Sequence, residues 1–296
     1  MANRVLSHIT FGSSPIVTAA RVHGLLDAEG LDAEVIATPN STEQMRGLGD
    51  GKYDIASTNF DNVMAWSGRD GRPEIIGVAG SGGPPILPVV VGRDINDWED
   101  LRGKPLAVDA VDTAYALVLR RILLAHGLDL DKGDYTLVPE GSTGYRFESM
   151  EKGNTFAAIL NPPWNKKAEE AGMKGFGDHR EVLPDYPGGV YCVSREWAEA
   201  NRDALLGFLR AIDGATKWVH DPATRDLAAK MVAAEEGSSE EEIAAGFSRQ
   251  PAAIDISAAA LEVSLGLRVQ FRLTPSMGPD VAKYLDASYL EAARTG

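Results

Sequence analysis

The first sixty residues alternate between strand-like and helix-like patterns, and this order restricts the fold more than any other feature of the chain. Residues 5–11 and 53–57 are short runs typical of strands, and residues 31–36 alternate carboxylates with aliphatic side chains, as a strand with one buried face does. Apolar side chains at helical spacing begin at residue 16 and stop at Gly30, and residues 40–43 form a capped helix start. The strand–helix–strand–helix–strand order predicts an α/β fold with an open sheet.

Small hydroxyl and amide side chains follow each of these strands. Ligands of open α/β sheets bind outside the carboxyl ends of the strands, where loops and helix N-termini present free N–H groups. Ser, Thr and Asn are also common in turns and helix caps, so each of them alone has two interpretations. Because three loops carry the same chemistry, we predict that one ligand-binding edge contains Ser13, Ser14, Ser41, Thr42, Thr58 and Asn59.

Two stretches resemble a known family. Residues 25–35 (LLDAEGLDAEV) are followed by LGDGKYDIA at residues 48–56, and this pair is similar to the opening of the type II periplasmic-binding-protein family in its NMT1/THI5-like branch. Residues 97–108 (DWEDLRGKPLAV) resemble the Asp-Leu-x-Gly-Lys turn that leads into the second lobe of that family. This branch contains the solute receptors of nitrate-, taurine- and sulfonate-type ABC importers.

The resemblance implies a two-lobed fold with a ligand cleft between the lobes. We expect residues 1–88 and 190–296 to form a discontinuous first lobe and residues 89–189 to form the second. In the family, the loop that corresponds to residues 109–113 usually faces the ligand. By the same resemblance, the loop after the alanine-rich strand at residues 156–160 would bring Asn161 and Trp164 to the pocket, although a tryptophan here can also simply pack on its own loop.

The expected site combines polar and aromatic side chains from both lobes. Phe60, Tyr115 and Trp164 are expected to stack on a flat or apolar part of the ligand. Arg146 is the cation nearest to a cleft loop and would pair with one carboxylate or sulfonate, the alternative being an arginine on a helix surface. The predicted ligand-binding residues of the second lobe are Thr113, Tyr115, Arg146, Asn161 and Trp164.

The same fold also supports enzymes, which is the alternative function. The family includes an aromatic sulfinate desulfinase, a dihydroxyphthalate decarboxylase and the pyrimidine-forming enzymes of thiamin synthesis. Ser14 corresponds to the cysteine nucleophile of the desulfinase, but no histidine lies in the cleft loops of the first lobe to activate it. The cysteine-rich motif of the pyrimidine-forming enzymes is absent. In a cytoplasmic lyase-like enzyme acting on a small aromatic acid, the candidate acids or bases would be Asp61, Asp109 and Asp112.

Composition argues against several other functions. A net charge of -14 disfavours nucleic acid and anionic lipid as partners, because both require clustered Lys and Arg. The single Cys192 excludes an internal disulfide, and the five histidines show no metal-ligand spacing. The glycine run at residues 80–83 lacks the features of a P-loop and of a dinucleotide loop. We therefore predict that the protein uses no metal and no cofactor.

These observations predict a receptor that captures a small organic ligand for an ABC importer, with an aromatic or heterocyclic acid or a sulfonate as the preferred class. No apolar run is long enough to cross a membrane, so we expect no direct membrane insertion. The first residues show no signal-peptide pattern. We expect a periplasmic or extracytoplasmic location if a signal was removed, and a cytoplasmic location if Met1 is the native start.

Overall fold

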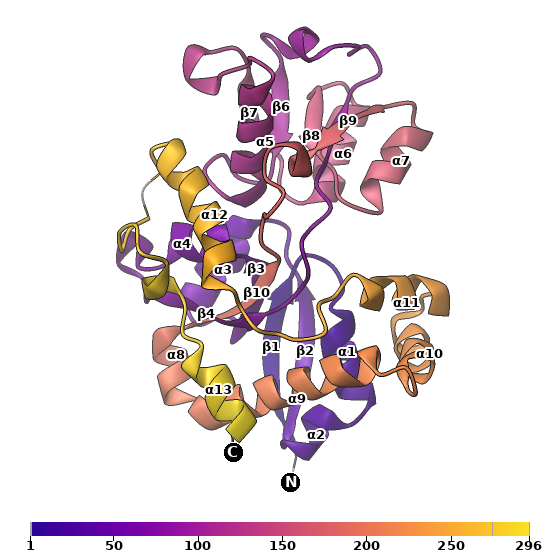
Figure 1. The fold of residues 1–296 in the computed structure, drawn as a ribbon, viewed down its shortest axis with the longest axis vertical. Helices are drawn as coiled ribbons and strands as arrows, with labels where there is room; N and C mark the ends of the chain where they lie inside the picture. Colours follow the sequence, from indigo (N-terminus) through magenta and orange to yellow (C-terminus); the bar gives the residue numbers. More distant parts are fainter. Residues whose placement is uncertain (1, 274, 296) are drawn as a thin grey trace.

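Two five-stranded sheets, one in each half of the molecule, form the framework of the chain (Figure 1). The computed structural model describes residues 2–273 and 275–295. The first sheet has the order β2-β1-β3-β10-β4, with β1 (Arg4–Thr10), β2 (Leu31–Ala37), β3 (Ile55–Asn59), β4 (Ile75–Gly80) and β10 (Gly189–Ser194). The second has the order β7-β6-β8-β5-β9, with β5 (Pro88–Val91), β6 (Pro105–Val108), β7 (Thr136–Pro139), β8 (Ala157–Ile159) and β9 (Lys174–Asp178). The predicted two-lobed α/β fold is confirmed, and we call the parts built on these sheets lobe 1 and lobe 2.

The strand directions bring several strand ends to one edge of each sheet. In lobe 1, β1 runs parallel to β2 and β3, and β10 runs antiparallel to β3, so that Gly189 at the start of β10 lies opposite Asn59 at the end of β3. In lobe 2, β6 runs parallel to β7 and β8. The boundaries predicted at residues 88/89 and 189/190 fall where the chain enters β5 and β10, and they remain a proposal.

Helices cover both faces of the lobe 1 sheet because successive strand residues point to opposite sides. Leu6 and Ile55 pack with α1 and α9 in one core, while Ile9 and Ala56 pack with α3 and α4 in the other. The expected helix from residue 16 to Gly30 is interrupted, because Gly24 has a φ of 78° and ends α1. The helices of this lobe are α1 (Pro15–Val22), α2 (Leu25–Ala28), α3 (Ser41–Gly49), α4 (Phe60–Trp66), α8 (Arg195–Ala200), α9 (Arg202–His220), α10 (Arg225–Glu236), α11 (Glu240–Ser248) and α13 (Ser288–Thr295).

Lobe 2 is smaller and follows the same plan. Leu106 and Leu119 belong to the core on one face of its sheet, and Ala107 and Phe147 belong to the core on the other. Its helices are α5 (Ala114–Ala125), α6 (Thr143–Glu151) and α7 (Trp164–Glu170). Short 3-10 turns occur at Arg69–Gly71, Trp98–Leu101, Leu130–Lys132, His179–Glu181 and Val281–Tyr284. The last of these turns is followed by α13 of lobe 1 near the end of the chain.

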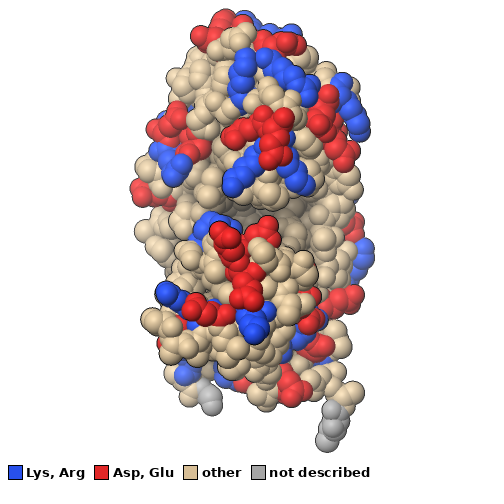
Figure 2. Space-filling view, turned by 90° about the vertical axis from the view of Figure 1, so that its right-hand side faces the viewer, with Lys and Arg blue, Asp and Glu red and all other residues tan. Residues whose placement is uncertain are grey.

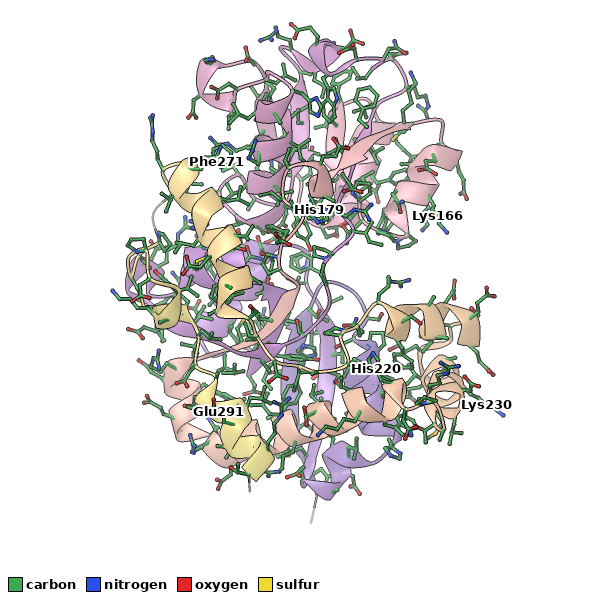
Figure 3. The ribbon with its side chains drawn as sticks, in the orientation of Figure 1. Lys166, His179, His220, Lys230, Phe271 and Glu291 are labelled. Atoms are coloured by element: carbon green, nitrogen blue, oxygen red, sulfur yellow. The ribbon has the colours of Figure 1, made fainter. Side chains whose placement is uncertain are left out.

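One helix that the sequence patterns did not predict, α12 (Ala258–Gln270), packs against both lobes (Figure 1). Leu261 and Leu265 belong to a lobe 1 core, whereas Leu267 belongs to the main core of lobe 2. Phe271 lies at the end of this helix beside lobe 2 (Figure 3), where the Arg120 guanidinium stands 4.1 Å from its ring centroid. The helix therefore connects the lobes on one side of the molecule.

The glycine run at residues 80–83 passes close to two other parts of the backbone. A Cβ on Gly188 would lie 2.0 Å from the carbonyl oxygen of Gly82, and a Cβ on Gly83 would lie 2.4 Å from the carbonyl oxygen of Arg249. These separations are far below van der Waals contact, and both carbonyl oxygens belong to the backbone and cannot rotate away. Glycine is needed at both positions because any side chain would push the crossing segments apart.

We expect the substitution Gly188→Ala to destabilise the protein by about 1–3 kcal/mol, the usual cost of overpacking. Urea unfolding followed by circular dichroism measures this change. Gly246→Ala in α11 is the matched control, because no atom lies within 4 Å of the added Cβ and the residue is helical. A Gly188→Ala protein as stable as the wild type would contradict the close approach.

Candidate functional site

A cavity of about 240 Å³ lies between the lobes, where the ends of strands from both sheets meet. Figure 2 shows a hollow across the middle of the molecule, between the two lobes. Lobe 1 lines the cavity with Thr10, Phe11, Ser57, Thr58, Asn59 and Asn62, and lobe 2 with Asp109, Thr113, Ala114, Tyr115, Thr143, Arg146 and Asn161. Ser81 and Gly189 complete the lining next to the connecting segments.

The structure brings half of the predicted ligand-binding residues together in this cavity. Thr58 and Asn59 lie at the end of β3, and Thr113 and Tyr115 flank the first residue of α5. The lobe 2 members that come from further along the chain are Arg146 on α6 and Asn161 after β8. Asp109, a candidate acid or base, also lines the cavity. Their role in binding remains a proposal.

Other predicted residues of lobe 1 do not line the cavity. Phe60 is fully buried in a core, because α4 begins at this residue and turns its ring toward Gly77. Ser14 lies beside the buried phenol of Tyr191, and Ser13 is exposed on the preceding loop. Ser41 is buried at the start of α3, and the neighbouring Thr42 lines a separate outer opening between the lobes.

Trp164 takes the packing role that was its alternative interpretation. Its ring centroid lies 5.5 Å from that of Phe147, and the Lys167 ammonium stands 4.2 Å from its ring. A Cβ on Gly144 would lie 3.0 Å from the indole, so the tryptophan covers the start of α6 closely. It lines an outer opening of the cleft rather than the cavity itself.

Two of the candidate acids are engaged in ion pairs. Asp61 is buried and pairs with Arg268, and Asp112 pairs with Arg69 at 3.1 Å. Burial raises the pKa of the Asp61 carboxyl, and the Arg268 guanidinium opposes that effect. Asp109 accepts hydrogen bonds from the backbone N–H of Ser41 at 3.2 Å to each carboxylate oxygen, which joins the lobes at the cleft. This arrangement uses all three carboxylates in contacts within the protein.

Sequence reasoning missed several lining residues. Thr10 and Ser57 lie in β1 and β3, Phe11 follows β1, and Thr143 begins α6. The rule that ligands bind at the carboxyl ends of strands would have found Thr10 and Phe11, since β1 ends there. Ser57 lines the cavity because of the side on which β3 presents its side chain, and the sequence contains no signal that predicts this side.

Arg146 is a buried cation without a carboxylate partner. Its side chain is 4% exposed, and no carboxylate oxygen of residues 2–273 or 275–295 forms an ion pair with it. Its Nη2 donates to Thr143 Oγ1 at 2.7 Å, and that hydroxyl donates to Asn161 Oδ1 at 2.8 Å. Its Nε has no hydrogen-bond partner within the described part of the chain. The guanidinium is thus held in place by neutral groups and keeps donors for another molecule.

The electrostatic environment of Arg146 confirms that its charge is poorly compensated. Burial lowers the pKa of this guanidinium, and nearby Asp109 and Tyr115 oppose the effect. Arginine nevertheless stays protonated in proteins. A buried positive charge of this kind is stabilised when an anion binds to it.

Two helix N-termini add further donors at the same place. Thr113 and Ser142 occupy the N-cap positions of α5 and α6, and neither side chain caps its helix. Thr113 is 2% exposed, and its hydroxyl has no partner in the residues that the structure covers. Free N–H groups and the helix dipole favour negative charge at such ends. Lobe 2 therefore presents a donor-rich, positively polarised wall.

The opposite wall of the cavity contains a histidine–serine pair. His8 Nε2 and Ser57 Oγ are 2.7 Å apart, and the imidazole is fully buried against Tyr191 and Phe208. Burial lowers the pKa of His8 to about 4, so the ring is neutral at pH 7. A base this weak activates a serine poorly. The Ser57 hydroxyl is therefore held by a hydrogen bond to a neutral, buried imidazole.

The described residues show no further centre for metal chemistry. Within residues 2–273 and 275–295, no three His, Cys, Asp or Glu side chains gather closely enough to hold a metal ion. Cys192 is buried, and burial raises the pKa of its thiol above the usual value. Among the helices of the described residues, none has the length and apolar character needed to cross a membrane.

Comparison with known proteins identifies the fold and matches part of the chain to a family model. A model of the NMT1-like family matches residues 89–233, just under half of the chain. A comparison with curated protein sequences gives no significant match.

Three solved structures illustrate the similarity of fold. The alkanesulfonate-binding protein SsuA from Xanthomonas axonopodis pv. citri, bound to MOPS, is 17% identical with a TM-score of 0.75, covering 97% of this chain and 99% of SsuA. The zinc-bound ligand-binding component of an ABC-type import system from Staphylococcus aureus is 15% identical with a TM-score of 0.77, covering 98% and 99%. The periplasmic nitrate-binding protein NrtA from Synechocystis PCC 6803 is 12% identical with a TM-score of 0.77, covering 98% and 88%. Residues 89–233 are thus similar to the NMT1-like family, and over its length the chain has the two-lobed α/β fold that it shares with SsuA and NrtA.

Proposed function

We propose that this protein is a solute receptor that captures a small organic anion between its lobes for an ABC importer. The observation that carries the proposal is Arg146, a buried guanidinium that lines the interlobe cavity and has no carboxylate partner among the residues that the structure describes. An anion placed there would receive hydrogen bonds from Arg146, from the Thr113 hydroxyl and from N–H groups in the first turns of α5 and α6 other than that of Ala114, which donates to Asp61.

The lining of the cavity limits the ligand. A volume of about 240 Å³ suits a molecule smaller than most drug-sized ligands. Asn62 Oδ1 is buried and has no hydrogen-bond partner among the described residues, and it lines the wall opposite Arg146. The Phe11 and Tyr115 rings supply apolar surface. A sulfonate or carboxylate on a short apolar or aromatic body that also carries a hydrogen-bond donor for Asn62 matches these features.

The structural relatives support the transport role. SsuA is described as an alkanesulfonate-binding protein bound to MOPS, which is itself a sulfonate, and NrtA as a periplasmic nitrate-binding protein. The Staphylococcus aureus relative is described as part of an ABC-type import system. By analogy, we place this protein outside the cytoplasm, with an ABC permease as its partner.

The geometry favours binding over catalysis. Ser14, the candidate nucleophile, lies outside the cavity lining, and Asp61 and Asp112 are held in ion pairs. Ser57 lines the cavity beside a histidine, but the low pKa of His8 makes that histidine a weak base. Of the candidate acids and bases, Asp109 alone lines the cavity, and its carboxylate accepts hydrogen bonds from the Ser41 N–H.

Calorimetric titration with matched anionic and neutral compounds tests this function. Benzenesulfonate and benzoate should bind, whereas benzenesulfonamide and benzamide should bind about 10- to 100-fold more weakly because they lack the charge that Arg146 receives. Mass spectrometry of the recovered compounds tests the alternative. Equal affinity for the neutral analogues would contradict the anion site, and a chemically altered compound would show an enzyme.

A further inference from the structure

The ion pair between Asp61 and Arg268 lies directly behind the ligand cavity. Arg268 Nη1 donates to Asp61 Oδ2 at 3.1 Å and to Oδ1 at 3.3 Å. The two side chains are 2% and 5% exposed, which makes this the most deeply buried ion pair between described residues. Asp61 lies in the first turn of α4 in lobe 1, and Arg268 lies on α12, the helix that packs on both lobes.

The same ion pair forms hydrogen bonds with the lobe 2 backbone on either side of one cavity residue, Thr113. Arg268 Nη1 also donates to the carbonyl oxygen of Asp112 at 3.1 Å, and the N–H of Ala114 donates to Asp61 Oδ2. Only Thr113 stands between the two anchored residues. Its hydroxyl is buried, without a partner in the described residues, and lines the cavity. The ion pair therefore fixes the peptide groups that carry this hydroxyl.

The backbone conformation of Ala114 reflects these hydrogen bonds. Its φ is +39°, a left-handed conformation that an alanine adopts only when its surroundings impose it. The hydrogen bond from its N–H to Asp61 is a contact that imposes it, and α5 starts at this residue. The orientation of the first turn of α5 relative to the cavity depends on this left-handed conformation of Ala114.

From this geometry we infer that Asp61 and Arg268 are positioning residues for the ligand site, which hold Thr113 and the N-terminus of α5 where they meet an anion. The inference deepens the proposed function and rests on it. Replacing a buried ion pair by apolar residues often leaves stability unchanged, so stability alone does not explain a pair with four directional contacts. The pair acts through Thr113 and not by touching the ligand, since neither Asp61 nor Arg268 lines the cavity.

The double variant Asp61→Leu/Arg268→Met tests the inference, because it removes both charges together and leaves none unpaired. We expect its affinity for benzenesulfonate to fall about tenfold or more while its melting temperature stays near that of the wild type. In a Thr113→Val background the same double substitution should cost less affinity than it does in the wild type, because only the contribution of the α5 N-terminus remains to be lost. The matched control is Glu29→Leu/Arg210→Met, which removes an ion pair between α2 and α9 outside the cavity lining and should leave affinity unchanged.

Equal losses of affinity in the wild-type and Thr113→Val backgrounds would overturn the inference, because they would show that the pair does not act through Thr113. If the double variant does not fold, hydrogen exchange of the ligand-free wild type tests whether the ion pair holds the backbone at Ala114. The Ala114 amide should exchange slowly, and fast exchange would show that its hydrogen bond to Asp61 is absent. Failure of the wild type to bind benzenesulfonate would count against the proposed function. The exchange rate of the Ala114 amide tests its hydrogen bond to Asp61 without any ligand.

Discussion

The substitution Arg146→Met is expected to weaken the binding of benzenesulfonate by about 30-fold or more. Removing one partner of a buried, charge-assisted contact costs about 2–5 kcal/mol, which corresponds to a loss of affinity of about 30-fold to several thousandfold. Arg146 receives no carboxylate from the described part of the protein, so its charge is available to the ligand. Isothermal titration calorimetry of the wild type and the variant measures the loss.

The folded state should tolerate this substitution, which separates binding from stability. Methionine fills much of the space of the arginine stem and removes a buried charge that has no ionic partner, so we expect the melting temperature to stay the same or to rise. Lys152→Met at the end of α6 is the control, because that side chain is exposed and pairs only with Glu148. An Arg146→Met protein with wild-type affinity would show that the anion binds elsewhere.

Protonation of His8 is expected to be a main reason why the free energy of unfolding falls at acidic pH. The pKa of His8 is lowered from 6.5 to about 4 by burial, so the unfolded chain takes up this proton at a higher pH than the folded protein does. The unfolded state therefore binds more protons in this window, and the free energy of unfolding falls as the pH drops from about 6.5 to about 4. At 1.36 kcal/mol per unit of pKa, the loss amounts to about 3 kcal/mol.

Urea unfolding at pH 7 and at pH 4.5 measures this effect. The variant His8→Phe should lose much less stability between these pH values than the wild type, because its side chain cannot take up a proton. His23→Phe serves as the control, since the His23 ring is exposed and stacks on Trp218. Identical pH dependence of the wild type and His8→Phe would contradict the account of His8 as a buried neutral imidazole.

The sequence predicted those parts of the site that depend on local pattern. The strand ends at Asn59 and Asn161 follow from short apolar runs that stop at polar residues, and both residues line the cavity. Arg146 was found because it follows a glycine-rich loop at the start of a helix. The rule for strand ends was sufficient for Asn59, whereas the expectation for Asn161 came from the family resemblance and that for Arg146 from its position near a cleft loop.

The contacts that depend on distant parts of the chain could not be predicted. Asp61 was interpreted as a candidate acid because its partner, Arg268, lies 207 positions later on a helix that no pattern identified. Phe60 is separated from the cavity residue Thr58 by only two positions, but the change from strand to helix turns its ring into the core. His8 reaches Ser57 through strand pairing, which periodicity alone does not reveal.

A crystal structure of the protein with 4-bromobenzenesulfonate tests the central claim most directly, because anomalous scattering from bromine locates and orients the compound. We expect the sulfonate in the interlobe cavity, with oxygens about 3 Å from the Arg146 guanidinium and the Thr113 hydroxyl. The bromine should point away from Arg146. A compound bound outside the cavity, or bound inside it with the sulfonate turned away from Arg146, would contradict the account.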